Sequence, residues 1–212
     1  MNPMRAIPPV PRINSRIAQG PAAPIPRRAA RLKSPQLLRH ARFSRCGRYR
    51  YTLTRAWGAG GTVAFVMLNP STADGTRDDA TIRRCIGLAR GWGYGGIEVV
   101  NLFAWRATQP RDLRRAAAPE GPGNRRALWA AIGRAEAVVL AWGNDGAWRD
   151  AGARLLRRLT RVCPDKELEC LGWTRLGHPR HVLYVRNDVQ RRRIFAANGS
   201  RSMRHARDVA GG

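Results

Sequence analysis

Four segments of the chain have the hydrophobic pattern of β-strands. Segments 62–68 (TVAFVML), 97–102 (IEVVNL) and 136–142 (EAVVLAW) are almost continuously apolar and partly β-branched, as strands covered on both faces are. Segment 48–54 (RYRYTLT) alternates polar and apolar positions instead, which predicts a half-buried strand. Pro70 cannot continue a central strand, so the first apolar run ends just before it.

The segments between these strands are predicted to contain helices. Segment 78–90 places apolar side chains on one helical face and acidic residues in its first turn, where the helix dipole favours them. The predicted apolar face consists of Ile82, Cys85, Ile86 and Ala89. Further helices are expected at 123–134 and 147–161, with a short helical piece near 111–115 in the long loop 103–122.

Two later segments, 167–172 and 181–185, are predicted as additional strands. Strands that alternate with helices indicate an α/β fold, a three-layer sandwich in which helices cover both faces of a central, mostly parallel sheet. In such sheets ligands bind in the crevice outside the carboxyl ends of the strands. The residues that follow each buried strand are therefore the first place to look for a site.

Positive charge is concentrated at the two ends of the chain. Lys and Arg number 39 against 14 Asp and Glu, a formal net charge of +25. Residues 1–45 contain ten basic residues, no acidic ones and eight prolines, so we expect this segment to be disordered. Its role is left open between an inert tail or translated non-coding sequence, a nucleic-acid-binding arm and a targeting peptide. Residues 187–212 are predicted to form a basic tail, which leaves 46–186 as one α/β domain.

The composition excludes several classes of protein. No apolar run approaches the ~18 residues that a membrane span needs, so no membrane partner is expected. The four cysteines form no CxxC pair and no disulfide framework, which favours a cytoplasmic location. We predict no metal and no cofactor, because the cysteines and histidines lack the tight spacing of a zinc site. The glycines at 91–96 follow a helix, the reverse of the order in a dinucleotide-binding fingerprint.

Polar and aromatic residues follow each of the three buried strands. Amides read a base edge through paired donors and acceptors, and aromatic rings stack on its face, so this set predicts recognition of a flat polar ring. The candidate binding residues are Asn69, Pro70, Ser71, Asn101, Phe103, Trp105, Arg106, Trp142 and Asn144. Asp74 and His181 are the candidate catalytic residues; the histidine precedes a predicted strand and joins the others only if its loop folds back.

These residues also have structural interpretations. Asn69 and Asn101 could close turns, and Asp74 could begin one. Trp105 and Trp142 could be packing residues of the core or its rim. Asp79, together with the aspartate before it, is best explained as an acid of the first helical turn.

Six short motifs lie in order along the domain. They are 67–74 (MLNPSTAD), 79–85 (DATIRRC), 92–94 (WGY), 101–108 (NLFAWRAT), 141–143 (AWG) and 177–181 (GHPRH). Together they resemble a bacterial protein family classed as domain of unknown function 1643, and the resemblance covers about residues 48–186. This family has no established activity to carry over.

More distantly, the chain resembles the uracil-DNA glycosylase superfamily. Those enzymes have a Pro-containing loop after one strand, an Asn at the end of another that reads the pyrimidine edge, and a late loop with His beside Pro. The resemblance implies that Asn101 selects the base and that His181 stabilises charge on the base oxygen. It further implies that Asp74 orients water.

The leading hypothesis is an α/β domain with a uracil-DNA-glycosylase-like fold that recognises or acts on a nucleobase or nucleotide. One alternative is a non-catalytic module that binds a nucleotide or nucleic acid. Another is a small amide or ester hydrolase that uses Ser71, although the G-x-S-x-G elbow is missing.

Overall fold

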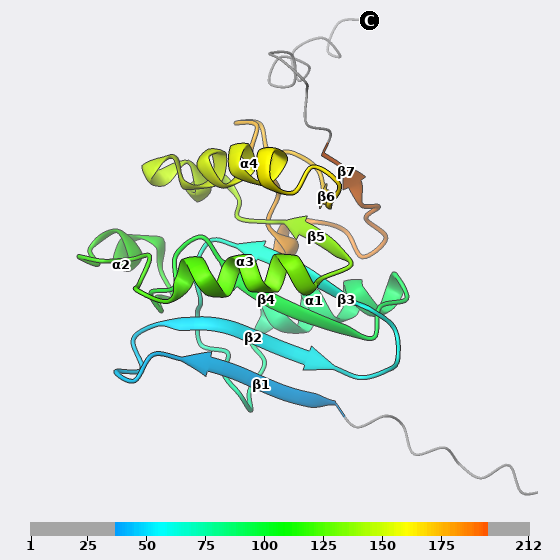
Figure 1. Ribbon diagram of the computed structural model, residues 1–212, viewed down its shortest axis with the longest axis horizontal. Coiled ribbons are helices and arrows are strands. Elements are labelled where there is room, and N and C mark those ends of the chain that lie inside the picture. Colours follow the sequence, from blue (N-terminus) through cyan, green and yellow to red (C-terminus); the bar gives the residue numbers. More distant parts are fainter. Residues whose placement is uncertain (1–36, 195–212) are drawn as a thin grey trace, which may run out of the picture. The chain divides into compact units, whose positions relative to one another are not determined.

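The strands of the chain form one sheet in the computed structural model, which describes residues 37–194 (Figure 1). The strands are β1 (Leu38–Phe43), β2 (Arg50–Ala56), β3 (Thr62–Met67), β4 (Gly96–Asn101), β5 (Ala137–Leu140), β6 (Glu167–Cys170) and β7 (Arg192–Arg193). Their order is β1-β2-β4-β3-β5-β6-β7. The four strands β4, β3, β5 and β6 run parallel to one another, and β2 and β7 pair antiparallel at either side. The predicted α/β fold with a central sheet is confirmed.

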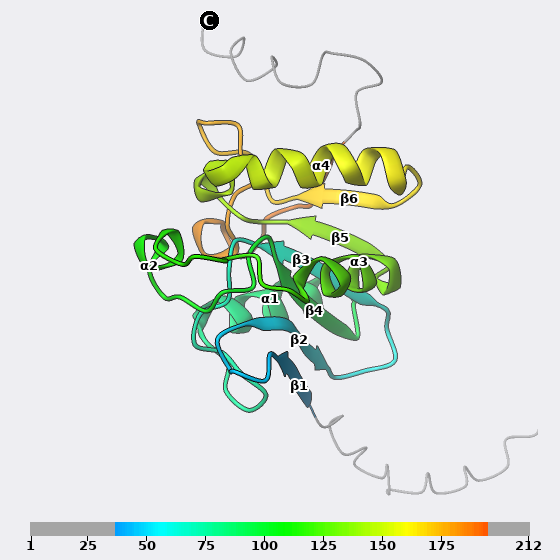
Figure 2. The ribbon, with the colours of Figure 1, turned by 60° about the vertical axis from the view of Figure 1, so that its left-hand side comes forward.

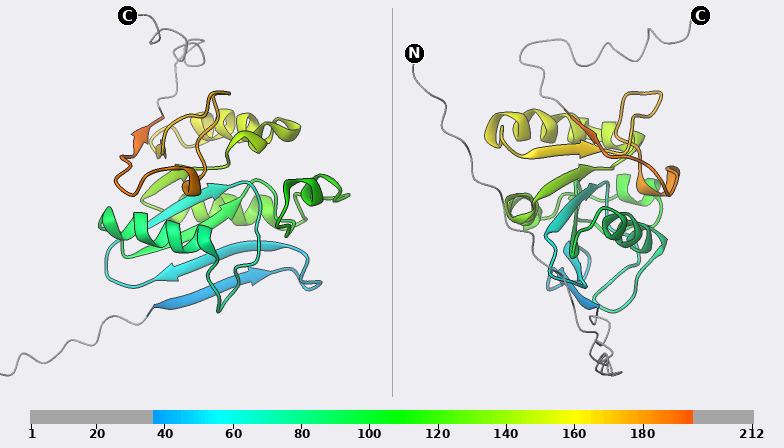
Figure 3. Two further views of the ribbon diagram at one scale, coloured as in Figure 1. Left: turned by 180° about the vertical axis from the view of Figure 1, so that it is seen from behind. Right: turned by 90° about the vertical axis from the view of Figure 1, so that its right-hand side faces the viewer.

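Helices cover both faces of this sheet. They are α1 (Ala80–Gly91), α2 (Pro110–Arg114), α3 (Asn124–Arg134) and α4 (Ala151–Val162), with 3₁₀ helices η1 (Asn144–Asp150) and η2 (Val182–Tyr184). One face is covered by α1, which stands in front of the sheet in the left view of Figure 3. The opposite face is covered by α3 and α4, and Figure 2 shows α4 over β5 and β6. Within residues 37–194, no helix has the length and apolar character needed to cross a membrane.

The apolar side of α1 forms the core on its face of the sheet. Ile82, Cys85, Leu88 and Ala89 are the buried residues of this helix, and they pack with Phe65 and other side chains of the parallel strands. The residues Ile82, Cys85 and Ala89 lie where the periodicity predicted them. The helix begins at Asp79, whose Oδ1 accepts a hydrogen bond from the backbone N–H of Ile82 at 2.8 Å.

The prediction of a strand at 181–185 is wrong. Residues 182–184 form η2 instead, and the carbonyls of Val182 and Val185 accept hydrogen bonds from the Arg84 guanidinium of α1 at 3.2 Å and 2.6 Å. An arginine side chain thus satisfies polar groups that a strand would have placed in a ladder. Apolar residues at 182–185 are compatible with a strand and equally with a turn packed on a helix. A pattern this short does not distinguish the strand from the turn.

The ordered domain extends beyond both boundaries expected from composition. Strand β1 lies inside segment 1–45, where no regular structure was expected, and β7 lies inside the predicted basic tail 187–212. Strand β1 is an exposed edge strand held by main-chain pairing to β2, so its sequence needs little apolar periodicity. Residues 1–36 and 195–212, with the remaining part of both predictions, lie outside the described residues.

A buried arginine of β2 holds the loop between β3 and α1, residues 68–79, hereafter the β3–α1 loop. The Arg55 side chain is fully buried, and its Nε contacts Asp78 Oδ1 at 2.7 Å. Its Nη2 donates to the backbone carbonyl of Asp74 at 2.6 Å, and its Nη1 donates to that of Thr54 at 2.9 Å. The guanidinium therefore ties two points of the loop to strand β2.

Replacing Arg55 by Met is expected to lower the free energy of unfolding by about 3–5 kcal/mol, because the largely buried Asp78 carboxylate loses its close partner and keeps only the half-exposed Arg39 at 3.6 Å. Urea unfolding followed by circular dichroism measures this change. The control is Arg157→Met, which breaks an Arg–Asp contact of the same 2.7 Å length on the surface. Exposed pairs contribute at most about 1 kcal/mol, so equal losses in the two variants would contradict the role given to Arg55.

Candidate functional site

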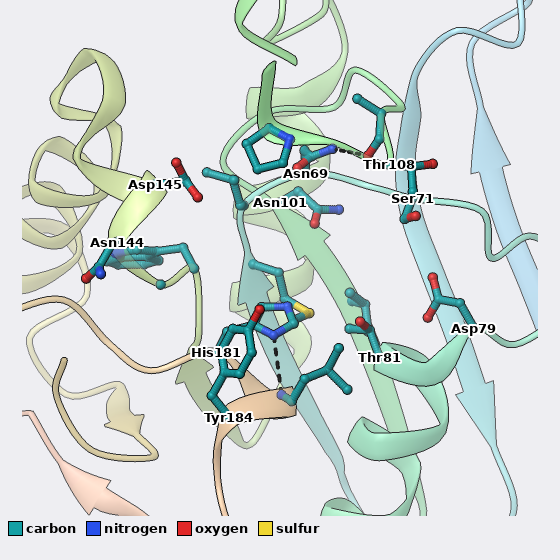
Figure 4. A pocket seen from close by; sticks show the side chains of 18 of the residues that line it. Asn69, Ser71, Asp79, Thr81, Asn101, Thr108, Asn144, Asp145, His181 and Tyr184 are labelled. Atoms are coloured by element: carbon teal, nitrogen blue, oxygen red, sulfur yellow. Dashed lines mark hydrogen bonds between the residues drawn. The ribbon is translucent and has the colours of Figure 1, made fainter. Parts of the chain in front are cut away.

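A cavity of about 720 Å³ opens at the carboxyl ends of β3, β4 and β5. Its volume lies in the range of small-molecule sites, roughly 300–1,000 Å³. Six of the residues selected from the sequence line it: Asn69, Ser71, Asn101, Trp142, Asn144 and His181. Figure 4 shows polar groups from separate loops directed toward this space. Parallel strands bring these loops together because their carboxyl ends lie on the same edge of the sheet.

Asn101 forms the buried polar floor of the cavity. It is the last residue of β4 and only 1% exposed, and its Nδ2 has no hydrogen-bond partner within the described residues. In Figure 4 its carboxamide lies between the Asn69 amide and the His181 ring. The Asn101 backbone carbonyl is held separately by Nδ2 of Asn124 at 3.0 Å. The main chain of Asn101 is thus anchored, while its carboxamide Nδ2 is left free to donate.

Asn69 uses its amide to hold two loops together. Its Nδ2 donates to the carbonyl of Ala107 at 2.7 Å and to that of Pro70 at 3.0 Å. The Ala107 N–H in turn donates to the Pro70 carbonyl at 2.9 Å. These bonds fix the distance between the β3–α1 loop and the loop after β4, so Asn69 shapes one wall of the cavity.

His181 reaches the cavity because η2 folds back against α1. Its Nδ1 accepts a hydrogen bond from the Leu183 backbone N–H at 3.3 Å, so the neutral ring carries its proton on Nε2. Burial lowers the pKa of His181, and the negative charge of Asp79 opposes this effect only in part. The imidazole is therefore uncharged at neutral pH and has one N–H available as a donor.

Asp74 does not line the cavity. Its Oδ1 closes a turn of the β3–α1 loop by accepting hydrogen bonds from the backbone N–H groups of Thr76 and Arg77, each at 2.7 Å. These bonds, with one from the Thr76 hydroxyl, lower the pKa of Asp74 to about 2. The structure thus gives this carboxylate the turn-forming role that was its alternative interpretation.

Four further candidates also lie outside the cavity lining. Pro70 and Phe103 are buried, and the Phe103 ring packs against Trp148 with centroids 4.8 Å apart. Trp105 packs edge-on against Tyr49 at 5.4 Å. Arg106 is exposed and donates to the Gly47 carbonyl at 3.2 Å. The contacts of Phe103, Trp105 and Arg106 stabilise the loop after β4, and none of the four side chains lines this cavity.

Several lining residues were not selected from the sequence, among them Arg50, Asp79, Thr81, Thr108, Asp145 and Tyr184. Asp79 is the N-cap of α1, and the helix start that it caps faces the cavity. It was recognised as a helix-start acid, but only the packing of α1 brings it to the site. Tyr184 is 78% exposed at the rim, 5.8 Å from the His181 ring centroid.

A β-bulge explains why Arg50 was missed. Arg42 of β1 pairs with Thr52, but the next residue of β1, Phe43, pairs with Arg50, so Tyr51 is an extra residue in β2. Strict alternation would have placed Arg50 on the same face as Thr52. The bulge turns Arg50 to the other face, where it lines the cavity. Nothing in the alternating pattern of 48–54 signals this change.

Within residues 37–194, no group of three or more His, Cys, Asp and Glu side chains is close enough to hold a metal ion. Cys85 and Cys170 are buried, whereas Cys46 is exposed. Neither these thiols nor the histidines of this part of the chain form a metal-binding cluster. The donors and acceptors of the cavity are amides, hydroxyls, carboxylates, imidazole and guanidinium.

The fold and the cavity define an α/β domain with a polar pocket at the carboxyl edge of its sheet. Residues 50–183 match the family described as "Protein of unknown function (DUF1643)". This match spans more than half of the chain, so the chain belongs to that family. No curated protein and no solved structure matches it.

His181 is expected to titrate below the ordinary histidine pKa of 6.5, because burial penalises the imidazolium form. A pH series of ¹H–¹³C NMR spectra of the histidine rings measures this value. The missing signal in His181→Gln identifies the residue. A midpoint at or above 6.5 would contradict the lowered pKa expected for His181.

Proposed function

We propose that the chain is a cytoplasmic protein that binds a nucleobase or nucleotide in this pocket and acts on it through a glycosylase-like site. The observation that carries the proposal is the Asn101 carboxamide, which is 1% exposed and whose Nδ2 has no partner among residues 37–194. A buried donor without a partner costs about 1–3 kcal/mol. A ligand with an acceptor at that position recovers this energy, and a base edge supplies one.

The surroundings of Asn101 favour a flat, partly polar ligand. Met67, Ile82 and Val99 contribute apolar surface to the cavity, and Trp142 and Tyr184 contribute aromatic surface. Apolar surface covers the faces of a ring while an amide meets its edge, which is how extruded bases are held. A base that lacked the matching acceptor would leave Asn101 unpaired, and this difference would select among bases.

The proposed reaction is hydrolysis of an N-glycosidic bond. The bond between the base nitrogen and the sugar C1′ breaks, and its electron pair stays with the base. His181 donates a hydrogen bond from Nε2 to the base oxygen on which negative charge develops. Water adds to C1′, and the proton that it loses ends on the released base, which leaves as a neutral molecule. A neutral donor suits this role, because it stabilises the developing charge without first needing to be protonated.

The carboxylate that orients water is proposed to be Asp79 in place of Asp74. Asp79 lines the cavity, and its Oδ1 is committed to the α1 cap, which leaves Oδ2 to accept a hydrogen bond from water. Asp74 has its Oδ1 bound to three donors of its own turn. The alternative of a hydrolase that uses Ser71 has less support. Within the described part of the chain, no hydrogen bond joins Ser71 Oγ to a side chain that could act as its general base.

Asn101→Ala is expected to weaken binding of the preferred nucleoside roughly 10- to 100-fold, the range that follows from losing a hydrogen bond in a buried site. Isothermal titration with the common deoxynucleosides and deoxyuridine measures the affinity. Gln190→Ala, which removes an exposed amide outside the cavity, should leave affinity unchanged. Equal affinities of wild type and Asn101→Ala for every nucleoside would refute the role of Asn101.

Base release from DNA containing uracil or damaged bases tests the reaction. His181→Ala is expected to lower the rate constant of base release roughly 10²- to 10³-fold, the usual effect of removing a donor to developing negative charge. Substrate affinity should change much less. Single-turnover assays on duplex and single-stranded DNA separate the two quantities. Binding without release in wild type would instead establish the non-catalytic module.

A further inference from the structure

Arg50 is a buried cation that faces the cavity without a carboxylate in contact. Its residue is 3% exposed, and its Nη1 donates to the Ala73 carbonyl at 2.7 Å. Within residues 37–194 its Nε has no hydrogen-bond partner, and no carboxylate oxygen lies within 4.0 Å of the guanidinium nitrogens. Burial lowers the pKa of Arg50 to about 10, so the group is still charged at neutral pH.

Arg55, on the same strand, is a buried arginine whose guanidinium nitrogens all have partners within the domain. It is also fully buried, but Asp78 contacts it at 2.7 Å and backbone carbonyls take its other nitrogens. Asp79 is the acid whose charge acts most strongly on Arg50, but it caps α1 and lies beyond contact distance of the guanidinium. A buried charge without a contacting counter-charge is costly, so Arg50 is suited to a partner that residues 37–194 do not supply.

A second unpartnered donor points to the same conclusion. The buried Nδ2 of Asn101 also borders this cavity. Trp142 Nε1 is buried and unpartnered too, but it lies against Gly146 and Gly152, where a Cβ would come within 2.7 Å of it, so it is closed to a ligand. The two donors that border the cavity, from β2 and β4, both require acceptors. An anionic oxygen is the acceptor that a guanidinium binds most strongly.

We propose that Arg50 is the anion anchor of this pocket and binds a phosphate group of the ligand. The inference rests on the proposed function, in which Asn101 binds the edge of a base. It narrows the ligand to a phosphorylated nucleotide, either free or within a nucleic-acid strand. Because Nη1 is bonded to the Ala73 carbonyl, Nε and Nη2 of the guanidinium are the donors proposed for the phosphate oxygens. The cavity of about 720 Å³ has room for a base and a phosphate together.

Titration of the full chain with matched ligand pairs tests this inference. The probes are deoxyuridine and the four common deoxynucleosides, each compared with its 5′-monophosphate, together with a short single-stranded oligonucleotide. We expect the preferred nucleotide to bind at least tenfold tighter than its nucleoside. Arg50→Lys should remove most of that advantage while affinity for the nucleoside persists, because lysine lacks the planar fork. The control Arg161→Lys changes an exposed arginine of α4 and should have no effect.

The outcomes separate the anion site from the proposed function. Equal binding of nucleoside and nucleotide by wild type would overturn the anion site and leave base recognition standing, and this comparison needs no variant to fold. Failure of every base-containing probe would refute the proposed function. The anion site is then decided by inorganic phosphate, which supports it if it raises the unfolding temperature of wild type more than that of Arg50→Lys and overturns it otherwise. Tighter Arg50-dependent binding of the oligonucleotide than of the monophosphate identifies a strand as the source of the phosphate.

Discussion

The pocket depends on the way that two arginines of β2 hold the β3–α1 loop by its backbone carbonyls. Arg55 binds the carbonyl of Asp74 and the carboxylate of Asp78, and Arg50 binds the carbonyl of Ala73. If a loop carbonyl that is bonded to a buried guanidinium moved away, the buried charge would lose a hydrogen-bond acceptor, which costs free energy. The loop therefore delivers Ser71 and the start of α1 to one fixed position beside the ends of the parallel strands.

The two arginines of β2 that stabilise the loop also contribute to the candidate site. Arg55 is fully paired and serves the loop, whereas Arg50 keeps a free donor beside the unpartnered amide of Asn101. Such local departures from complete pairing are expected where a protein binds a ligand, because stability is given up for preorganised donors. The neutral His181, held by the backbone N–H of Leu183 and by the contact of Arg84 with η2, adds a third preorganised group.

Much of the architecture could be predicted from the sequence, because continuous apolar runs and helical periodicity are direct consequences of burial. The strands at 62–68 and 97–102 and the helix at 78–90 were placed within one or two residues of β3, β4 and α1. Strand β1 and the turn η2 were not predicted. Edge pairing of β1 needs no apolar pattern, and η2 is set by an arginine almost one hundred residues earlier in the chain.

For the candidate site, the sequence by itself determined that Asn69, Asn101 and Trp142 lie at or just after the ends of buried strands, and parallel strands necessarily gather such residues at one edge. Only the tertiary structure decided which polar groups face inward. The Asp74 carboxylate closes a tight turn of its own loop and does not reach the cavity, whereas Asp79 reaches the cavity at the start of α1. The tertiary structure also directed Arg50 inward through a single extra residue in β2, because one residue of register reverses the face on which a strand presents a side chain.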